Sequence, residues 1–223
     1  MRIITKLLCC VFVLITFSAC ETYDIALNGI PKFVNQDVVE LAKVKRISKF
    51  RSSVGHSYTD NYEKCRSMKH YYSLVNISGL TPGDSSLVFS PVNGSVIKIF
   101  DENSQNGVQF WIRPNDNKAF TIAVFHVVTS KKINVGSELK AGDILGKTAS
   151  TDIAVMVNQF LGYKNISYFE IMTDDLFKTY LNRGINSVSE MIITKEQRDA
   201  KPCQCDGETF INSEFQEDWK VLN

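Results

Sequence analysis

Zinc accepts thiolate and imidazole ligands, and one set in this chain would make a Cys₃His site: Cys65, His70, Cys203 and Cys205. The Cys-x-Cys spacing of the last two is not the usual spacing of structural zinc sites. The competing interpretation is a disulfide between Cys65 and either Cys203 or Cys205, which would tie the C-terminal segment to the core. The spacing favours the disulfide and leaves the choice of partner open.

The segment from Asp60 to Tyr72 combines charged side chains with aromatic ones. Its titratable residues include Asp60, Glu63, Arg66, Lys69 and His70. Such a mixture suits recognition of an anionic or glycan ligand. It is equally typical of an ordinary solvated surface, so both interpretations stay open.

The elements that would position a site are predicted strands in the middle of the chain. Apolar residues alternate with their neighbours at Phe120, Ile122 and Val124, which predicts a strand with one buried face. We expect antiparallel strands from Phe89 to Val128 and a turn back on them from Val135 to Gly146. The glycines of this region mark tight turns or close backbone approach.

Three motifs follow one another along these strands. Ser90–Val96 reads SPVNGSV, a later predicted strand ends in His126, and a glycine-punctuated turn runs from Val135 to Gly146. In this order the motifs resemble those of the lysostaphin-type (LytM-like) zinc endopeptidases, which cut peptide cross-links in bacterial cell walls. The resemblance covers roughly 120 residues. It implies a mostly β fold, a LytM-like antiparallel β-sandwich of the barrel-sandwich hybrid type, here with a short helical C-terminal extension.

The resemblance also implies where a zinc site would lie. In the family, the His and Asp of an H-x-x-x-D motif bind the metal, and here His56 and Asp60 have that spacing. His126 corresponds to an active-site His at the end of an earlier strand. The family's H-x-H strand is followed by F-E-[IV], and here Ile166 and Tyr168 stand in place of its two histidines.

A second alignment of that strand passes through Asp152-Ile153-Ala154, which also lacks both histidines, although Asp152 could itself bind a metal. The first alignment predicts a strand over Ser167–Met172. A catalytic zinc needs three protein ligands and an open position for water, so the incomplete set predicts no bound metal. An active peptidase remains the alternative, with zinc held by His56, Asp60 and a third ligand: His70, His126 or Asp152.

The first nineteen residues have the pattern of a signal peptide. A basic start is followed by an apolar run, Leu7–Phe17, that is shorter than the roughly 20 residues needed to span a bilayer. The run ends in Phe17-Ser18-Ala19-Cys20, which resembles the lipobox of bacterial lipoproteins, with Phe17 in an atypical first position. We expect Cys20 to be diacylated and to anchor the protein on a membrane, outside the cytoplasm. The alternative is cleavage after Ala19 without a lipid.

These patterns divide the chain into a signal peptide (1–19), a polar tether (20–34), a LytM-like β domain (35–173) and a helical extension (174–223). In the extension, helical spacing predicts a helix over Asp174–Asn182, and Thr194 with Gln197 predicts a capping box. The net charge of +1 gives no electrostatic argument for nucleic acid.

The sequence therefore predicts a non-catalytic cell-envelope binding or regulatory lipoprotein on a peptidase-like scaffold. Its expected partners are a cell-wall peptide or glycan, or an envelope protein, with the membrane reached through the lipid. No cofactor is expected. The alternative is an active zinc metallopeptidase with a reorganised metal site.

Overall fold

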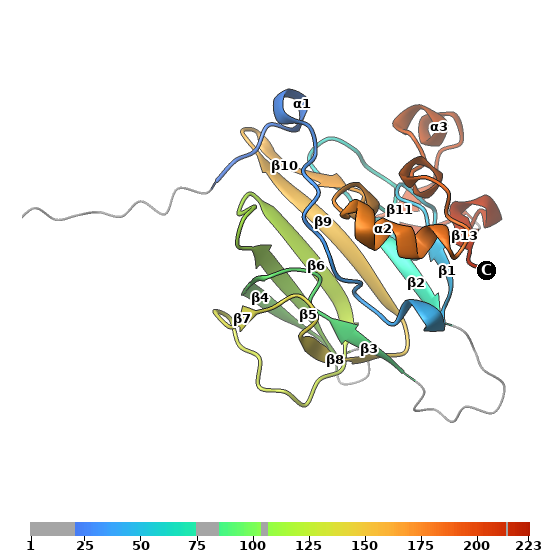
Figure 1. Ribbon diagram of the computed structural model, residues 1–223. Coiled ribbons are helices and arrows are strands. Elements are labelled where there is room, and N and C mark those ends of the chain that lie inside the picture. The colour runs from blue at the N-terminus through green and yellow to red at the C-terminus, as the bar shows by residue number, and fades with distance from the viewer. Residues whose placement is uncertain (1–20, 75–84, 104–106, 213) are drawn as a thin grey trace, which may run out of the picture.

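The computed structural model describes residues 21–74, 85–103, 107–212 and 214–223, and its main feature is one large sheet (Figure 1). In spatial order the strands are β13 (Trp219–Val221), β1 (Val44–Ser48), β2 (His70–Leu74), β9 (Thr151–Gln159), β6 (Phe120–Val127), β5 (Gly107–Pro114), β4 (Gly94–Asn103) and β7 (Glu138–Leu139). A ninth strand, β10 (Gly162–Ile166), pairs with β9 beyond the end of β2. Every pairing within it is antiparallel, which confirms the expected mostly β, antiparallel fold.

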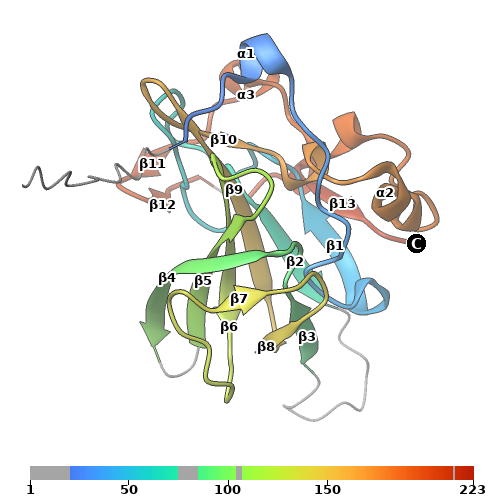
Figure 2. The ribbon, with the colours of Figure 1, turned by 60° about the vertical axis from the view of Figure 1, so that its left-hand side comes forward.

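A second, two-stranded sheet of β3 (Ser86–Phe89) and β8 (Ile144–Thr148) closes the lower end of the molecule (Figure 2). Its side chains Val88 and Leu145 join the same hydrophobic core as the large sheet. Gly94 lies where β4 meets β5, and a Cβ there would come within 2.4 Å of the Arg113 carbonyl oxygen. Gly142 has φ +89°, in the region that favours glycine.

Strand β6 is buried on both faces. Phe120, Ile122 and Val124 have no exposed surface and belong to the main core, as the alternation predicts. Their neighbours were expected to be exposed, and that expectation is wrong: Ala123 and Phe125 form a second cluster with Ala154 and Met156 of β9. Tyr58 and Trp111 pack against this second cluster. A strand in the middle of a sheet covered on both sides loses the one-sided pattern.

The segment Ser167–Met172 is not the strand that the sequence predicts. It contains a 3-10 helix, η2 (Tyr168–Glu170), which begins with a capping box between Ser167 and Glu170. Only Met172 makes a β-bridge, parallel to Val34. The apolar spacing of this segment reflects full burial, which a short helical turn satisfies as well as a strand does.

The remaining helices are short and lie on one side of the sheet or at its ends. They are α1 (Ile25–Asn28), η1 (Leu41–Lys43), α2 (Asp174–Leu181), η3 (Val188–Met191), α3 (Lys195–Ala200) and η4 (Gln216–Asp218). The expected helix at Asp174 and the capping box of Thr194 with Gln197 are both present. None of the helices in the described part of the chain has the length and apolar character needed to span a bilayer.

The C-terminal segment returns to the sheet and completes one edge of it. β13 pairs with β1, and the Arg46 guanidinium lies 4.0 Å from the centre of the Trp219 ring. Just before β13, Asp218 accepts hydrogen bonds from Arg198 at 2.7 Å, and both side chains are almost fully buried. The last residues therefore form an edge strand of the folded sheet.

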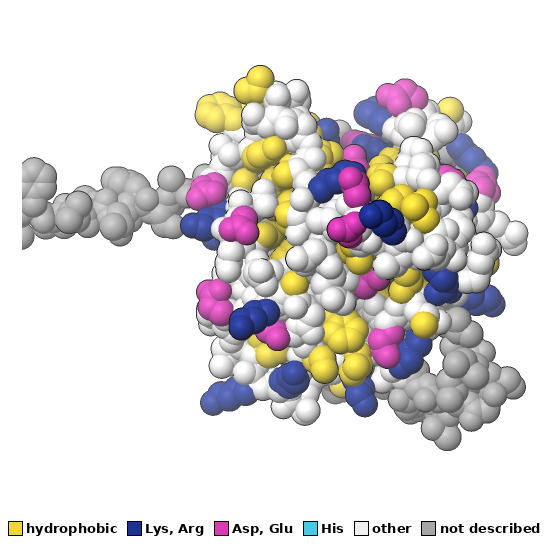
Figure 3. Space-filling model, in the orientation of Figure 1, with side chains coloured by type: hydrophobic (Ala, Val, Ile, Leu, Met, Phe, Trp, Pro, Cys, Tyr) yellow, Lys and Arg dark blue, Asp and Glu magenta, His cyan; other side chains and the backbone are white. Residues whose placement is uncertain are grey.

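The surface seen in Figure 3 carries both signs of charge, interspersed over the sheet and helices. Hydrophobic side chains gather at its upper end, over α1 and the turn between β9 and β10. The opposite end of this face, below the sheet, is mostly polar and basic.

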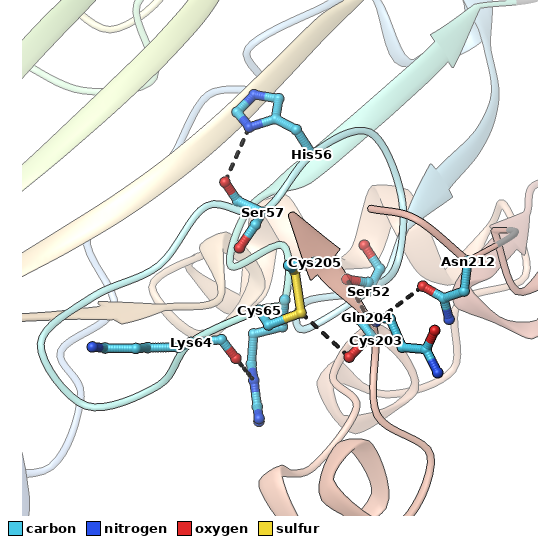
Figure 4. The surroundings of a disulfide bond; sticks show 10 residues. Ser52, His56, Ser57, Lys64, Cys65, Cys203, Gln204, Cys205 and Asn212 are labelled. Carbon is cyan, nitrogen blue, oxygen red and sulfur yellow. Dashed lines mark hydrogen bonds between the residues drawn. A yellow bond between two sulfur atoms is a disulfide. The ribbon is translucent and has the colours of Figure 1, made fainter. Parts of the chain in front are cut away.

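A disulfide joins Cys65 to Cys205, so of the two partners left open by the sequence the structure selects Cys205 (Figure 4). Cys205 begins a small hairpin of β11 (Cys205–Asp206) and β12 (Thr209–Phe210). Cys203 remains a buried free thiol, and its carbonyl oxygen lies 3.3 Å from the Cys65 sulfur. A zinc site made of these cysteines and His70 is therefore absent from the described residues.

We predict that losing this disulfide destabilises the protein by about 2–4 kcal/mol, because it closes a loop of 140 residues. Since Cys203 could replace Cys205, the variant to use is Cys203→Ser with Cys205→Ser, compared with Cys203→Ser alone. Urea unfolding under oxidising conditions measures the difference. Equal midpoints for the two variants would contradict the assigned pairing.

Candidate functional site

Three strands bring a group of charged side chains together on the second face of the sheet. β2 pairs with β9 so that Tyr71 lies opposite Asp152, and Lys69 lies directly before the first residue of β2. β6 pairs with the other edge of β9, with Val124 opposite Ile153, and His126 follows at its end. The site therefore lies where β9 begins between two neighbouring strands.

The centre of the group is an ion pair between the Lys69 ammonium and an Asp152 carboxylate oxygen, Oδ2. Each side chain is 1% exposed, so the pair is removed from water. Burial lowers the pKa of Lys69, but the attraction of Asp152 outweighs this and the net direction is upward. Burial raises the pKa of Asp152, but the Lys69 and His126 charges beside it hold the pKa below its usual range. Both members are therefore charged at neutral pH.

Aromatic rings enclose the Lys69 ammonium. The nitrogen lies 4.2 Å from the ring centre of Phe125, 4.8 Å from that of Tyr71 and 5.1 Å from that of Tyr58. A cation over the face of an aromatic ring is attracted by the electron density of that face. These contacts, together with Asp152, replace the water that the ammonium loses on burial.

His56 also contacts Lys69. Its Nε2 lies 3.1 Å from the Lys69 Nζ, and an ammonium can only donate, so Nε2 accepts. The proton is then on Nδ1, which donates to the Ser57 carbonyl oxygen at 3.1 Å (Figure 4). The lone pair of His56 that could bind a metal is directed at the lysine.

His126 connects the pair to a second carboxylate. Its Nε2 lies 3.1 Å from Asp152 Oδ1, and its Nδ1 lies 2.9 Å from Glu102 Oε2. Hydrogen bonds to Asp152 and Glu102 raise the pKa of His126 to about 9. The ring is therefore an imidazolium at neutral pH, and the two cations Lys69 and His126 balance the two anions.

The backbone at His126 is strained into this position. Its φ is +58°, unusual for a residue other than glycine, and its N–H donates to Glu102 Oε2 at 2.8 Å. The register of β5 and β6 shifts here by a β-bulge, between the pairs Phe110–Val124 and Val108–Val127. Strain of this kind costs about 1–3 kcal/mol and persists where the surroundings enforce it. Here the two carboxylates enforce it.

The other residues expected in a zinc site have different surroundings. Asp60 Oδ1 accepts from the N–H groups of Tyr62 and Glu63, and its Oδ2 accepts from that of Asn165, so it orders a loop. His70 is fully buried between the Ser48 carbonyl oxygen and the Ser167 hydroxyl, and burial lowers its pKa to about 4. The structure places neither side chain in contact with His56 in the described residues.

Ile166 and Tyr168 belong to the main core. Ile166 ends β10, opposite Val155, and the Tyr168 hydroxyl donates to the Gln36 carbonyl oxygen at 3.2 Å. Asp152, the residue of the second alignment, is the one that lies beside His126. The segment Asp60–Tyr72 is also not an ordinary solvated surface, although Lys64 is exposed. The five titratable side chains that the sequence singled out are buried: Asp60, Glu63, Arg66, Lys69 and His70.

The residues present do not fit a zinc ion. A metal bound by His56 and Asp152 would have to share their donor atoms with the Lys69 ammonium, which contacts both side chains. Asp152 Oδ1 is already bonded to the imidazolium of His126. Among the described residues, no three His, Cys, Asp or Glu side chains form a group that could hold a metal ion. A fixed ammonium therefore stands between the donors that a zinc ion would need.

A surface cleft lies over this buried group. It has a volume of about 450 Å³, and its lining residues are Ser57, Tyr58, Thr59, Lys64, Cys65, Tyr163, Cys205, Gly207 and Glu208. Tyr58 separates the cleft from Lys69, since its ring is also a wall of the aromatic enclosure. The cleft offers two tyrosines, hydroxyl groups and one charge of each sign, a combination suited to a polar ligand with flat apolar faces.

The sequence contained only part of this site. It identified His56 and His126 as candidates and left Asp152 as a second possibility. Lys69 was assigned to a polar cluster, and Glu102 gave no signal. A signal for Lys69 exists in hindsight, because it stands between Met68 and His70 at the start of a strand and both neighbours have no exposed surface.

No family model and no curated protein sequence matches the chain. Among solved structures it is similar to the catalytic domain of lysostaphin from Staphylococcus simulans, with 18% identity and a TM-score of 0.37, over 55% of this chain and 88% of that one. It is also similar to a chain of the SpoIIQ–SpoIIIAH pore-forming complex, with 13% identity and a TM-score of 0.42, over 63% and 91%.

A third similar structure is a protein of Ruminococcus gnavus assigned as the glycyl-glycine endopeptidase LytM, with 14% identity and a TM-score of 0.36. The match covers 46% of this chain and 44% of that protein, so this chain spans less than half its length. Lysostaphin and LytM are the proteins whose family the sequence resembles. The likeness is partial and concerns the fold alone.

We predict that Lys69→Met lowers the free energy of unfolding by about 3–5 kcal/mol, because it leaves the buried Asp152 carboxylate without its main partner. Urea unfolding measures this. The control is Lys69→Met with Asp152→Asn, which should recover part of the loss because both charges are removed together. If Lys69→Met alone lowers the free energy of unfolding by less than about 0.5 kcal/mol, as substitutions at surface sites do, the assignment of a buried ion pair is wrong.

A second prediction concerns pH. The pKa of His126 is raised in the folded protein to about 9 from an ordinary value of 6.5, so its protonation stabilises the fold fully below about pH 6.5. That contribution is lost as the pH rises through about 9. Urea midpoints at about pH 6, 8 and 10 should fall more in the unchanged protein than in His126→Gln. Parallel curves for the two proteins would show that His126 is not the titrating group.

Proposed function

We propose that this protein is an exported, lipid-anchored binding or regulatory protein of the cell envelope, with a peptidase-like scaffold and no hydrolytic activity. The observation that carries the proposal is the Lys69 ammonium, which is held between His56 and Asp152. It supplies permanently the positive charge that a zinc peptidase obtains from its metal.

Two features of the site argue against catalysis. Zinc-dependent hydrolysis needs an open metal position for water, and here the Lys69 side chain is directed at the candidate donors. It also needs a base to accept a proton. Because the pKa of His126 is raised to about 9 by Asp152 and Glu102, its ring is already protonated at neutral pH.

The cleft over Tyr58 is the proposed binding site. Tyr58 and Tyr163 can stack on sugar rings or pack against peptide side chains. Lys64 and Glu208 can bind the opposite charges of a short peptide. A cell-wall peptide or glycan is the ligand that fits this chemistry best, and an envelope protein presenting a similar segment is the second candidate.

The anchor rests on the leader sequence and Cys20, which lie outside the described residues. A lipid at Cys20 would keep the domain at a membrane surface outside the cytoplasm. The competing function is an active metallopeptidase, in which zinc would have to displace Lys69 from His56.

The test uses the full mature protein and purified cell-wall sacculi. We expect cosedimentation with the sacculi, no release of soluble peptides and no stoichiometric zinc after purification. Lys64→Ala with Tyr163→Ser should weaken cosedimentation about tenfold, the equivalent of 1.4 kcal/mol. Lys140→Ala, an exposed lysine outside the cleft, should leave cosedimentation unchanged.

Tight zinc that is lost in His56→Ala, together with release of peptides, would overturn the proposal in favour of the peptidase. If the cleft variant and Lys140→Ala cosediment with the sacculi equally well, the cleft is not the binding site.

A further inference from the structure

The turn between β9 and β10 exposes two large apolar side chains at the end of the molecule. Phe160 is 91% exposed and Leu161 is 75% exposed. Gln159 and Gly162 pair across the turn, so these two residues form its whole tip. Two-residue hairpin turns normally carry Gly, Asn or Asp, and a Phe-Leu pair there gains nothing from the turn conformation.

The turn is held in place by its neighbours. The Tyr62 hydroxyl donates to the Leu161 carbonyl oxygen at 3.1 Å, and the Tyr163 N–H donates to the Asn61 side chain at 2.8 Å. Tyr62 is itself 52% exposed, so an amphipathic ring stands beside the apolar tip. Helix α1 stands at the same end of the molecule in both ribbon views and carries Leu27, which is 81% exposed (Figures 1 and 2).

Tyr23, near the N-terminal end of the described residues, contacts the base of this turn. The Tyr23 N–H donates to the Asn158 carbonyl oxygen at 2.8 Å, and the Gln159 side chain donates to the Tyr23 carbonyl oxygen at 2.5 Å. The Tyr23 ring also packs edge-on against Phe120, at 5.2 Å between centres. The segment expected to be a tether is therefore docked on the domain from Tyr23 onward.

This docking fixes the distance between the turn and Cys20. Tyr23 is the third residue after Cys20, and an extended chain spans at most about 11 Å over that length. If Cys20 carries a lipid, the end of the domain that bears Phe160, Leu161 and Leu27 must lie next to the bilayer. A protein partner at this end would have to compete with the membrane for the same surface.

We infer that the Phe160–Leu161 turn, together with Leu27, enters the membrane interface and fixes the orientation of the anchored domain. The inference rests on the lipid anchor of the proposed function. Apolar side chains at a membrane surface are buried about 5–10 Å into the boundary between headgroups and acyl chains. Tyrosine is enriched at the level of the headgroups, which is where Tyr62 would lie.

The test uses the full-length lipoprotein in vesicles of phosphatidylethanolamine and phosphatidylglycerol that contain a nitroxide-labelled lipid. Phe160→Trp should show blue-shifted emission and quenching by shallow nitroxides. The matched control is Val135→Trp, an exposed apolar position just before β7, the edge strand that β6, β5 and β4 separate from β9. Its emission should stay that of a tryptophan in water. The unchanged protein supplies the background from Trp111 and Trp219.

The anchor is tested separately by Cys20→Ser, which should move the protein from the membrane fraction to the soluble one. If the unchanged protein is also soluble, the anchor proposal fails and the membrane inference fails with it. If the protein is anchored and the tryptophan introduced by Phe160→Trp is not quenched, only the inference is overturned. Shielding of that tryptophan from aqueous iodide in whole envelopes, without quenching by lipid, would also overturn it, in favour of a protein partner.

Discussion

The ion pair of Lys69 with Asp152 is the interaction on which the second face of the sheet depends. Removing two charges from water is costly, and the cost is offset here by the aromatic rings around the ammonium and by His126 and Glu102. Replacing a buried ion pair by well-packed apolar residues is often neutral or stabilising. The presence of four charges at this place is therefore better explained by the arrangement they impose, with the Lys69 ammonium beneath the Tyr58 ring, than by stability.

Strand β9 connects this centre to the rest of the molecule. At one end it carries Asp152, and at the other it leads into the Phe160–Leu161 turn. One of its edges pairs with β6, while the other pairs first with β2 and then with β10. A change in the position of β9 would move the buried charges and the exposed Phe160–Leu161 turn together, so the cleft and this turn have a fixed relation to each other.

The C-terminal segment closes the side of the cleft that the sheet leaves open. The disulfide of Cys65 with Cys205 places the β11–β12 hairpin along the cleft wall, and the Ser57 N–H donates to the Glu208 carbonyl oxygen at 2.7 Å. Asp218, which follows the hairpin, accepts hydrogen bonds from the Arg198 side chain and from the Ser53 N–H, and these hold its segment against Ser53. What resembles an appended extension in the sequence thus supplies two walls of the proposed binding site: the sulfur bridge and the loop with Glu208.

The sequence by itself determined the features that depend on local pattern. The alternation at Phe120, Ile122 and Val124 indicated a strand, the capping box of Thr194 with Gln197 indicated a helix start, and His126 was placed at a strand end. Only the tertiary structure decided which charges meet. Lys69 and Asp152 lie on distant segments, and they come together because β2 pairs with β9. β6 pairs with the opposite edge of β9, and a bulge at the end of β6 turns His126 toward Asp152. Strand register of this kind is set by long-range pairing and by burial on both faces of the sheet, which a local pattern of residues does not record.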